Sequence, residues 1–335
     1  MEQLAPQQFT KQFINGEWKD GSSTKSITSY NPYNGEELVT IQAANQQDLD
    51  DAYEAAARAQ KVWEATPLVE KQQRFEQLVA VLQSKRELII DWLINEAGGT
   101  KLKATSEFNS ALRIVKESAS FLTRLTGQIL PSYVPNKENR VYRTAKGVIG
   151  VIGPWNFPFL LSMRSIAPAI ATGNGVVIKP ASDTPVTSGL LFGEIFEEAG
   201  FPAGLVNVIV GRGSEIGDAF VQHPIPSLIS FTGSTEVGRR IGELAGYHLK
   251  DVALELGGNN VMVVLKDANI ERAARAAAFG KFMHQGQICM ALNRIIVEKD
   301  VHDEFVEAFT AIVSKLKVGD PHADATFIGP LINRE

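Results

Sequence analysis

The 335-residue sequence contains a single cysteine, Cys289, which excludes any disulfide within the chain. Structural zinc cages and iron–sulfur clusters need several thiolates, so these groups are excluded as well. The five histidines are scattered and lack the spacing of a helical metal site. We therefore expect no metal. The histidines are His223, His248, His284, His302 and His322.

Long hydrophobic runs and an excess of positive charge are also missing. The most apolar stretch, residues 147–161, is interrupted by glycine and proline and is too short to span a bilayer. Residues 1–18 are polar, so no signal peptide is expected and the cytoplasm is the default compartment. The net charge of −5 argues against nucleic acid or an anionic membrane surface as a partner.

The composition that remains is that of a globular protein. Hydrophobic residues make up 44% of the chain and charged residues 21%, which excludes disorder. At roughly 150 residues per domain, the length predicts two folded units. Strands are expected at 12–14 and 26–29, helices from 48, at 70–83, 85–97 and 103–126, and an extended polar ribbon at 131–143.

From residue 148 onward, short β-branched runs alternate with helical segments. This alternation predicts an α/β fold: a doubly wound parallel sheet with a second α/β unit. The strands are expected at 148–152, 175–179, 206–210, 228–231, 252–256, 261–264 and 294–298, and helices at 237–245, 270–281 and 301–316.

Cys289 lies in the segment HQGQIC, residues 284–289, between a predicted helix and a predicted strand. Two interpretations stay open at this point: a nucleophile, or a small buried hydrophobic side chain. A free thiol is only about a few per cent thiolate at neutral pH, so a nucleophile here needs local activation.

Glu255 and Asn156 are polar residues in apolar surroundings. Glu255 interrupts the predicted strand at 252–256, where it is either a buried acid or base or a solvated side chain. Asn156 directly follows the strand at 148–152, in the position where open α/β sheets bind ligands. Its amide either donates to an oxyanion or simply forms a turn beside Pro158.

Three further strand ends have the composition of a phosphate site. Lys179 ends the strand at 175–179, where its ammonium either reaches a ribose or phosphate or is solvated. Glycine-rich segments follow two other strands, at 211–217 and 232–238, and permit close approach of a phosphate to backbone N–H groups. Each segment alone is equally well a turn and a helix cap, but together with Lys179 they predict one dinucleotide site.

Taken together, these segments resemble the aldehyde dehydrogenase superfamily. The resemblance rests on five motifs in the family's order along almost the whole chain: PWNFP at 154–158, KP at 179–180, FTGS at 231–234, ELGG at 255–258 and GQIC at 286–289. The segment HQGQICM at 284–290 is similar to the benzaldehyde and vanillin dehydrogenase branch.

The resemblance implies oxidation of an aromatic or other apolar aldehyde to the acid, with NAD or NADP reduced. Cys289 would form a thiohemiacetal and then a thioester, Asn156 and the Cys289 N–H would hold the oxyanion, and Glu255 would activate the hydrolytic water. Lys179 would bind the adenosine ribose. The other implied cofactor contacts are Ile152, Pro154, Trp155, Ser182, Gly213, Gly217, Phe231, Thr232, Gly233, Ser234, Val237, Gly238, Leu256 and Gly257.

Ser182 departs from the pattern of the family. NAD-preferring members often carry a glutamate here that binds the ribose hydroxyls. A serine removes a negative charge that would repel a 2′-phosphate, and Arg212 is placed to receive one. We therefore expect NADP to be accepted alongside NAD.

The resemblance also implies how the chain is organised. Residues 1–124 and 146–257 would form the dinucleotide-binding domain, 125–145 an oligomerisation ribbon, and 258–335 the first part of the catalytic domain. Family members continue well past residue 331, so we expect a fragment or an incomplete enzyme, which is a homo-oligomer (dimer or tetramer) in its complete form.

Two alternatives to this interpretation remain. In the first, the thioester would be passed to coenzyme A, although a water-activating Glu255 has little purpose in that reaction. The other alternative is a non-catalytic nucleotide-binding or structural protein, in which replacement of Cys289 would have no consequence.

Overall fold

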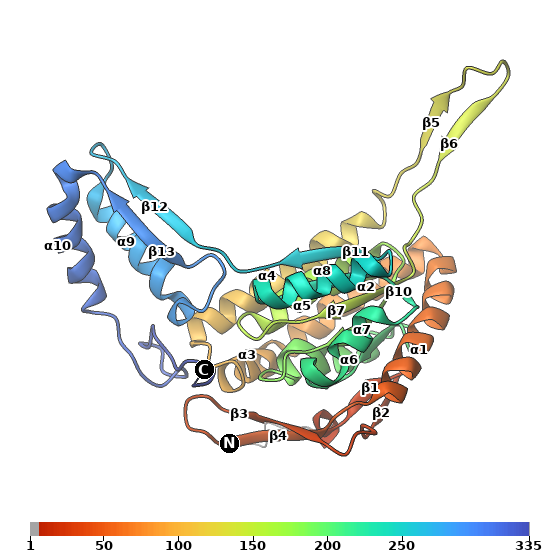
Figure 1. Ribbon diagram of the computed structural model, residues 1–335, viewed down its shortest axis with the longest axis horizontal. Helices are drawn as coiled ribbons and strands as arrows, with labels where there is room; N and C mark the ends of the chain where they lie inside the picture. The colour runs from red at the N-terminus through yellow and green to blue at the C-terminus, as the bar shows by residue number, and fades with distance from the viewer. Residues whose placement is uncertain (1–6, 335) are drawn as a thin grey trace.

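The computed structural model describes residues 7–334, so the start of the polar stretch 1–18 lies outside the described residues. Within that range the largest sheet has seven strands in the order β11-β10-β7-β8-β9-β1-β2 (Figure 1). The strands are β1 (Gln12–Ile14), β2 (Glu17–Lys19), β7 (Val148–Ile152), β8 (Gly175–Lys179), β9 (Val206–Val208), β10 (Pro226–Thr232) and β11 (Asp251–Glu255). Strands β7 to β11 are parallel, as expected, whereas β1 and β2 add an antiparallel edge.

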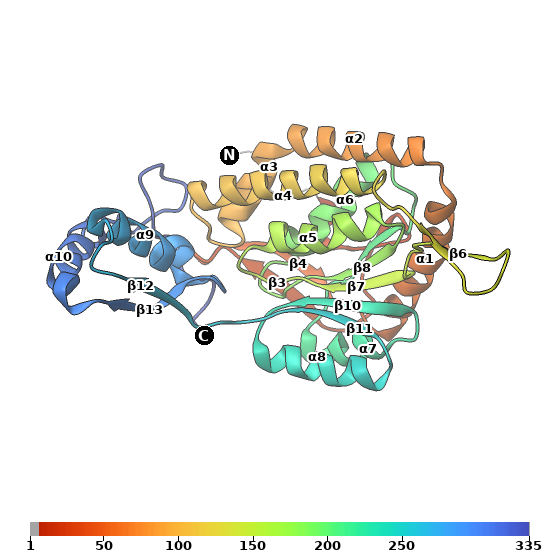
Figure 2. The same ribbon diagram turned by 90° about the horizontal axis from the view of Figure 1, so that it is seen from above.

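Alternating side chains of the central strands separate two hydrophobic cores. In β7, Ile149 and Val151 belong to one core, and Val148 and Ile152 to the other. Figure 2 shows α2 and α4 to α6 over one face of the sheet and α7 and α8 over the other. This confirms the doubly wound α/β fold. The helices are α1 (Gln46–Ala65), α2 (Leu68–Ser84), α3 (Arg86–Asn95), α4 (Lys101–Phe121), α5 (Pro158–Ala171), α6 (Leu191–Glu198), α7 (Asp218–Gln222) and α8 (Thr235–Tyr247).

Two of the helix ends that differ from the prediction have local reasons. Helix α1 begins at Gln46, because the Asn45 side chain accepts from the backbone N–H of Asp48 and the Asp48 side chain accepts in return from that of Asn45. Helix α4 ends at Phe121 rather than at residue 126. Thr126 and Gly127, which precede β5, are poor helix formers.

A second, smaller unit follows β11. Strands β12 (Asn260–Val264) and β13 (Leu292–Val297) form a parallel pair, covered by α9 (Ile270–Phe282) and α10 (His302–Val313). Its own core includes Val264, Ala274 and Phe305. The predicted domain boundary at 257/258 falls in the connection between β11 and β12 and stays a prediction.

Two hairpins complete the described structure. Strands β3 (Ser26–Tyr30) and β4 (Glu37–Gln42) pair beside the N-terminal segment. Strands β5 (Gln128–Pro131) and β6 (Glu138–Val141) form the predicted ribbon, which projects away from the rest of the molecule (Figure 1). All residues of β5 and β6 are exposed. None of the helices in residues 7–334 combines the length and the apolar character needed to cross a membrane.

Candidate active site

The carboxyl ends of four parallel strands meet at one edge of the large sheet. The register pairs Ile152 with Lys179 and with Phe231, and Thr232 with Glu255. Open α/β sheets bind their ligands at this edge. The structure therefore brings together the residues that the sequence placed separately at the ends of β7, β8, β10 and β11.

Lys179 is buried, so the solvated alternative for this residue was wrong. Its Nζ donates to the backbone carbonyls of Pro180 at 3.0 Å and Gly211 at 3.1 Å. Burial lowers the pKa of the ammonium to about 8, which leaves it mostly charged at neutral pH. Nζ has three N–H groups, and the third has no partner among residues 7–334, so it is left for an oxygen of a ligand.

The two glycine-rich strand ends have different surroundings. An added Cβ at Gly213 or Gly217 would meet no atom of the described residues within 4 Å, so this turn borders open space. A Cβ at Gly238 would instead collide with Leu256, which means that glycine allows α8 to pack closely beside the end of β11. Ser234 caps α8, and its Oγ accepts from the Val237 N–H at 3.3 Å. The other N–H groups of that first turn suit an anion.

The remaining predicted cofactor contacts are not equally accessible. The side chains of Ile152 and Phe231 lie in a hydrophobic core, so only their backbones can meet a ligand. Pro154 is also buried, whereas Trp155, Ser182, Thr232 and Gly233 are half-buried, and Val237, Gly257 and Arg212 are exposed.

The Cys289 thiol is exposed, which overturns the interpretation of this residue as a buried hydrophobic side chain. Two asparagines hold its loop. Asn156 Nδ2 donates to the carbonyl of Gln287 at 3.0 Å, and Asn260 Nδ2 donates to the carbonyl of Cys289 at 2.6 Å. The loop is thereby fixed between the turn after β7 and the start of β12.

The Asn156 amide has a fixed orientation, and one of its N–H groups is not used in a hydrogen bond to the described residues. Its Oδ1 accepts from the Phe157 N–H at 2.8 Å, which identifies the nitrogen that faces Gln287. Only one of the two Nδ2 hydrogens is used by that carbonyl. Asn156 is thus a turn former and a potential oxyanion donor at once.

Glu255 is exposed at the end of β11 and pairs with Arg164 of α5 at 3.5 Å. The chain after Glu255 runs along the cysteine loop. An added Cβ at Gly258 would lie 3.6 Å from the Cys289 carbonyl oxygen, and the Gly258 carbonyl accepts from Asn293 Nδ2 at 3.2 Å. The segments that carry Glu255, Asn156 and Cys289 therefore lie beside one another, and the catalytic roles of the three residues stay predictions.

Several residues of this site escaped the sequence reasoning. Arg164 was detectable as a charge in the otherwise apolar segment 158–171, and Asn260 closely follows the glycine pair after Glu255. The buried ion pair of Lys103 and Glu107 on α4 could not be recognised from the sequence, because opposite charges four residues apart are also typical of a solvated helix face.

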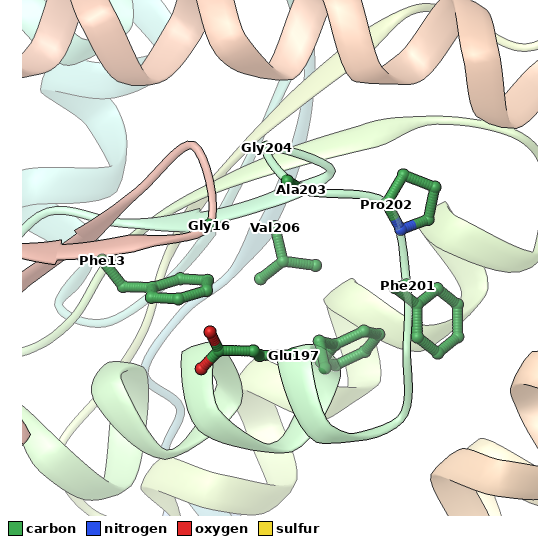
Figure 3. A pocket seen from close by; sticks show the side chains of 9 residues that line it. Phe13, Gly16, Glu197, Phe201, Pro202, Ala203, Gly204 and Val206 are labelled. Atoms are coloured by element: carbon green, nitrogen blue, oxygen red, sulfur yellow. The ribbon is translucent and has the colours of Figure 1, made fainter.

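A cavity of about 110 Å³ lies elsewhere (Figure 3). It is lined by Phe13, Phe201 and Val206 among others, and Val206 begins β9. This is the amino end of the parallel strands, opposite the edge that carries Lys179, so the cavity is not part of the site. The described residues contain no cluster of three or more side chains suited to a metal ion.

The comparison with known families agrees with this geometry. Residues 18–335 match the model of the "Aldehyde dehydrogenase family". The chain belongs to the aldehyde dehydrogenase family. The segments PWNFP, KP, FTGS, ELGG and GQIC all lie within the matched residues.

Curated aldehyde dehydrogenases similar to this chain include two bacterial enzymes. Vanillin dehydrogenase of Corynebacterium glutamicum is 56% identical over 97% of this chain, which covers 67% of that protein. Benzaldehyde dehydrogenase YfmT of Bacillus subtilis is 51% identical over 98% of this chain, again covering 67%. The chain spans about two thirds of the length of both relatives.

Solved aldehyde dehydrogenase structures have the same fold. The crystal structure of a NAD-dependent benzaldehyde dehydrogenase from Corynebacterium glutamicum superposes with a TM-score of 0.93 at 55% identity, covering 97% of this chain and 70% of that one. A 3,6-anhydro-L-galactose dehydrogenase in complex with NAP has a TM-score of 0.94 at 32% identity, covering 97% and 68%.

Proposed function

We propose that this protein oxidises an aromatic aldehyde to the carboxylic acid and reduces NAD or NADP. The observation that carries the proposal is the hydrogen bond from Asn156 Nδ2 to the Gln287 carbonyl, which puts an oxyanion donor beside the loop of the exposed Cys289. Relatives named as vanillin and benzaldehyde dehydrogenases support the substrate class.

The proposed chemistry begins at Cys289. Its thiolate adds to the aldehyde carbon, and the carbonyl oxygen becomes an oxyanion held by the spare N–H of Asn156. A bound NAD or NADP would supply the hydride acceptor for that carbon, and Cys289 would then hold the acyl group as a thioester. Glu255 then takes a proton from water, the hydroxide attacks the thioester, and the acid leaves as the thiol is restored.

The residues at the sheet edge fit a dinucleotide. Lys179 presents one unused N–H, the first turn of α8 presents backbone N–H groups, and the turn at Gly213–Gly217 borders open space. Relatives named for NAD and for NADP support either cofactor. The cytoplasm, a homo-oligomer and a small-molecule aldehyde as the substrate stay predictions.

Two aromatic or apolar side chains lie beside the proposed reaction centre. Phe157 follows Asn156, and Met290 follows Cys289 and is 75% exposed. Phe159, two residues after Phe157, is fully buried and stacks on Phe192 with ring centroids 5.0 Å apart. It belongs to the core, so we assign aldehyde recognition to Phe157 and Met290.

The test is to incubate the purified protein with benzaldehyde, vanillin and acetaldehyde, each with NAD and with NADP, and to follow the absorbance of the reduced cofactor. We expect turnover with the aromatic aldehydes that Cys289→Ala abolishes, while nucleotide binding measured by calorimetry is unchanged. Turnover that survives in Cys289→Ala would contradict the thiol mechanism. Nucleotide binding without turnover in the unaltered protein would contradict the proposed activity for this chain and show either an incomplete enzyme or a non-catalytic binding protein.

A further inference from the structure

A buried ion pair lies beneath the turn that carries Asn156. Lys103 Nζ and Glu107 Oε2 of α4 are 2.5 Å apart, and both side chains are almost fully buried. Glu107 Oε1 accepts from the first N–H groups of α5, those of Phe159 at 2.9 Å and Leu160 at 3.1 Å. The carboxylate therefore ties α4 to the start of α5, directly after the Asn156–Phe157 turn.

Phe157 connects this ion pair to the cysteine loop. The Lys103 ammonium lies 4.5 Å from the centroid of the Phe157 ring, the arrangement of a cation–π interaction. The His284 ring packs edge-on against the same ring, with centroids 5.5 Å apart at an angle of 76°. Lys103, Phe157 and His284 thus form one chain of contacts from α4 to the loop of Cys289, in which Phe157 is half-buried and the other two side chains are buried.

His284 is 1% exposed, and neither ring nitrogen has a hydrogen-bond partner of normal geometry in the described range, although the Asn156 carbonyl lies close enough to act weakly on the ring. Burial first, and then the nearby Lys103 ammonium, holds the pKa of the imidazole well below its usual value, and the Asn156 carbonyl acts more weakly in the opposite direction. The ring is therefore neutral at neutral pH and contributes packing rather than charge. Unpartnered buried nitrogens cost free energy, so their presence needs a compensating role.

The backbone at His284 has a strained conformation that a packed ring can hold in place. His284 and Gln285 have φ values of 47° and 60°, and Gly286 follows at 75°. Consecutive left-handed residues other than glycine are strained and persist only where surrounding contacts hold them. Here the Gln287 N–H donates to the His284 carbonyl at 3.0 Å, and Gln285 Nε2 donates to the Pro330 carbonyl at 2.6 Å.

We propose that His284 is a positioning residue for Cys289: its ring, packed on Phe157, holds the left-handed turn at 284–286, which presents the thiol beside Asn156. The Lys103–Glu107 pair holds Phe157 in place from the side of α4. The effect on catalysis rests on the proposed function, whereas the effect on the loop does not, so the two are measured separately.

The first measurement needs no turnover. Hydrogen–deuterium exchange and the rate of Cys289 alkylation by iodoacetamide are compared in the unaltered protein, His284→Ala and His302→Ala, which removes an exposed imidazole on α10. We expect His284→Ala alone to raise exchange at 284–291 at least about tenfold and to change the alkylation rate, because the turn is released. Unchanged exchange in a folded His284→Ala protein would overturn the proposal.

The second measurement separates the ring from its nitrogens. His284→Phe keeps a ring against Phe157 and removes the unpartnered nitrogens, so we expect it to keep most of the exchange protection and of kcat. His284→Ala is expected to lower kcat by about 10- to 100-fold with little change in aldehyde KM, as a misplaced reacting group does. Equal losses of loop protection in both variants would overturn the role of the ring. If the unaltered protein shows no turnover, the proposed function fails while the exchange result still decides the role of His284.

Discussion

At the scale of single residues, the site depends on side chains whose polar atoms are only partly used. Asn156 gives one amide N–H to Gln287, and Lys179 gives two ammonium N–H groups to Pro180 and Gly211. The bonds that are made fix the orientation of each group, and the remaining N–H is available to a ligand without a conformational change. Such preorganisation is how fixed dipoles stabilise a developing charge.

Ser182 sets the choice of cofactor in our first prediction. Ser182→Glu places a carboxylate beyond Lys179-Pro180, where it would repel a 2′-phosphate and accept hydrogen bonds from ribose hydroxyls. We expect NADP turnover or binding to fall by at least about tenfold while that with NAD is kept, measured as kcat/KM or Kd for each cofactor. An equal loss of kcat/KM or affinity with both cofactors would contradict this role of Ser182.

Arg164 orients the Glu255 carboxylate in our second prediction. Its guanidinium lies 3.5 Å from that carboxylate. Both side chains are about half exposed, so the pair is worth at most about 1 kcal/mol. Arg164→Met should therefore lower kcat by up to about fivefold, because the carboxylate loses the partner that orients it. Arg275→Met, which breaks a more exposed pair with Glu271 on α9, is the control and should leave kcat in place.

At the scale of secondary-structure elements, Glu96 joins three segments of the molecule. It follows α3 and is fully buried. Its carboxylate accepts from the N–H groups of Val186 at 3.0 Å and Thr187 at 2.7 Å, in the segment that precedes α6. The hydroxyls of Thr187 at 2.6 Å and Ser29 at 3.1 Å also donate to it. Burial raises its pKa from 4.5 to about 7 despite these donors.

The raised pKa of Glu96 makes stability depend on pH, which is our third prediction. Between about pH 4.5 and 7 the folded protein binds more protons at this group than the unfolded chain, so the free energy of unfolding falls as pH rises through that window. The loss is up to about 3 kcal/mol, at 1.36 kcal/mol per pKa unit.

Urea unfolding at pH 5 and pH 8 measures this effect. Glu96→Gln should remove this part of the pH dependence and, because one oxygen cannot serve all four donors, should cost about 1–3 kcal/mol at pH 5. Glu87→Gln, an exposed residue of α3, is the matched control. Parallel pH dependence in Glu96→Gln and the unaltered protein would contradict the assignment to Glu96.

At the scale of the whole molecule, the β5–β6 ribbon is the most conspicuous unpaired feature. It projects from the body and exposes apolar side chains such as Ile129 at 69% and Val141 at 43% (Figure 1). A two-stranded hairpin is marginally stable by itself in water, and exposed apolar strand surface favours association. We propose that the ribbon binds a second copy of the chain.

The fourth prediction tests that interface. The double variant Ile129→Lys and Val141→Lys should lower the molar mass measured by light scattering to that of the monomer and leave the circular dichroism spectrum unchanged. Val62→Lys, an equally exposed apolar position on α1, should not change the mass. An unaltered mass in the ribbon variant would remove the ribbon from the interface.

Much of this architecture was predictable from local pattern. The β-branched runs at Val148–Ile152 and Gly175–Lys179 have the predicted bounds, because strands buried on both faces are continuous apolar segments. The antiparallel edge β1–β2 was not predicted, since which strand pairs with which depends on contacts remote in sequence, such as Phe13 with Val208. The assignments of Asn156, Glu255 and Cys289 to catalysis came from motifs and stay predictions until variants are measured.

The sequence by itself determined the family, the alternating α/β pattern and the chemical groups of the site, because motif order and hydrophobic period are local properties of the chain. Only the tertiary structure decided burial: that Lys179 and His284 are enclosed, that Cys289 and Glu255 are exposed, and that Lys103 and Glu107 pair inside the core. Burial is the sum of contacts from segments far apart in sequence, and it sets the pKa of Lys179 and the strain that the cysteine loop sustains.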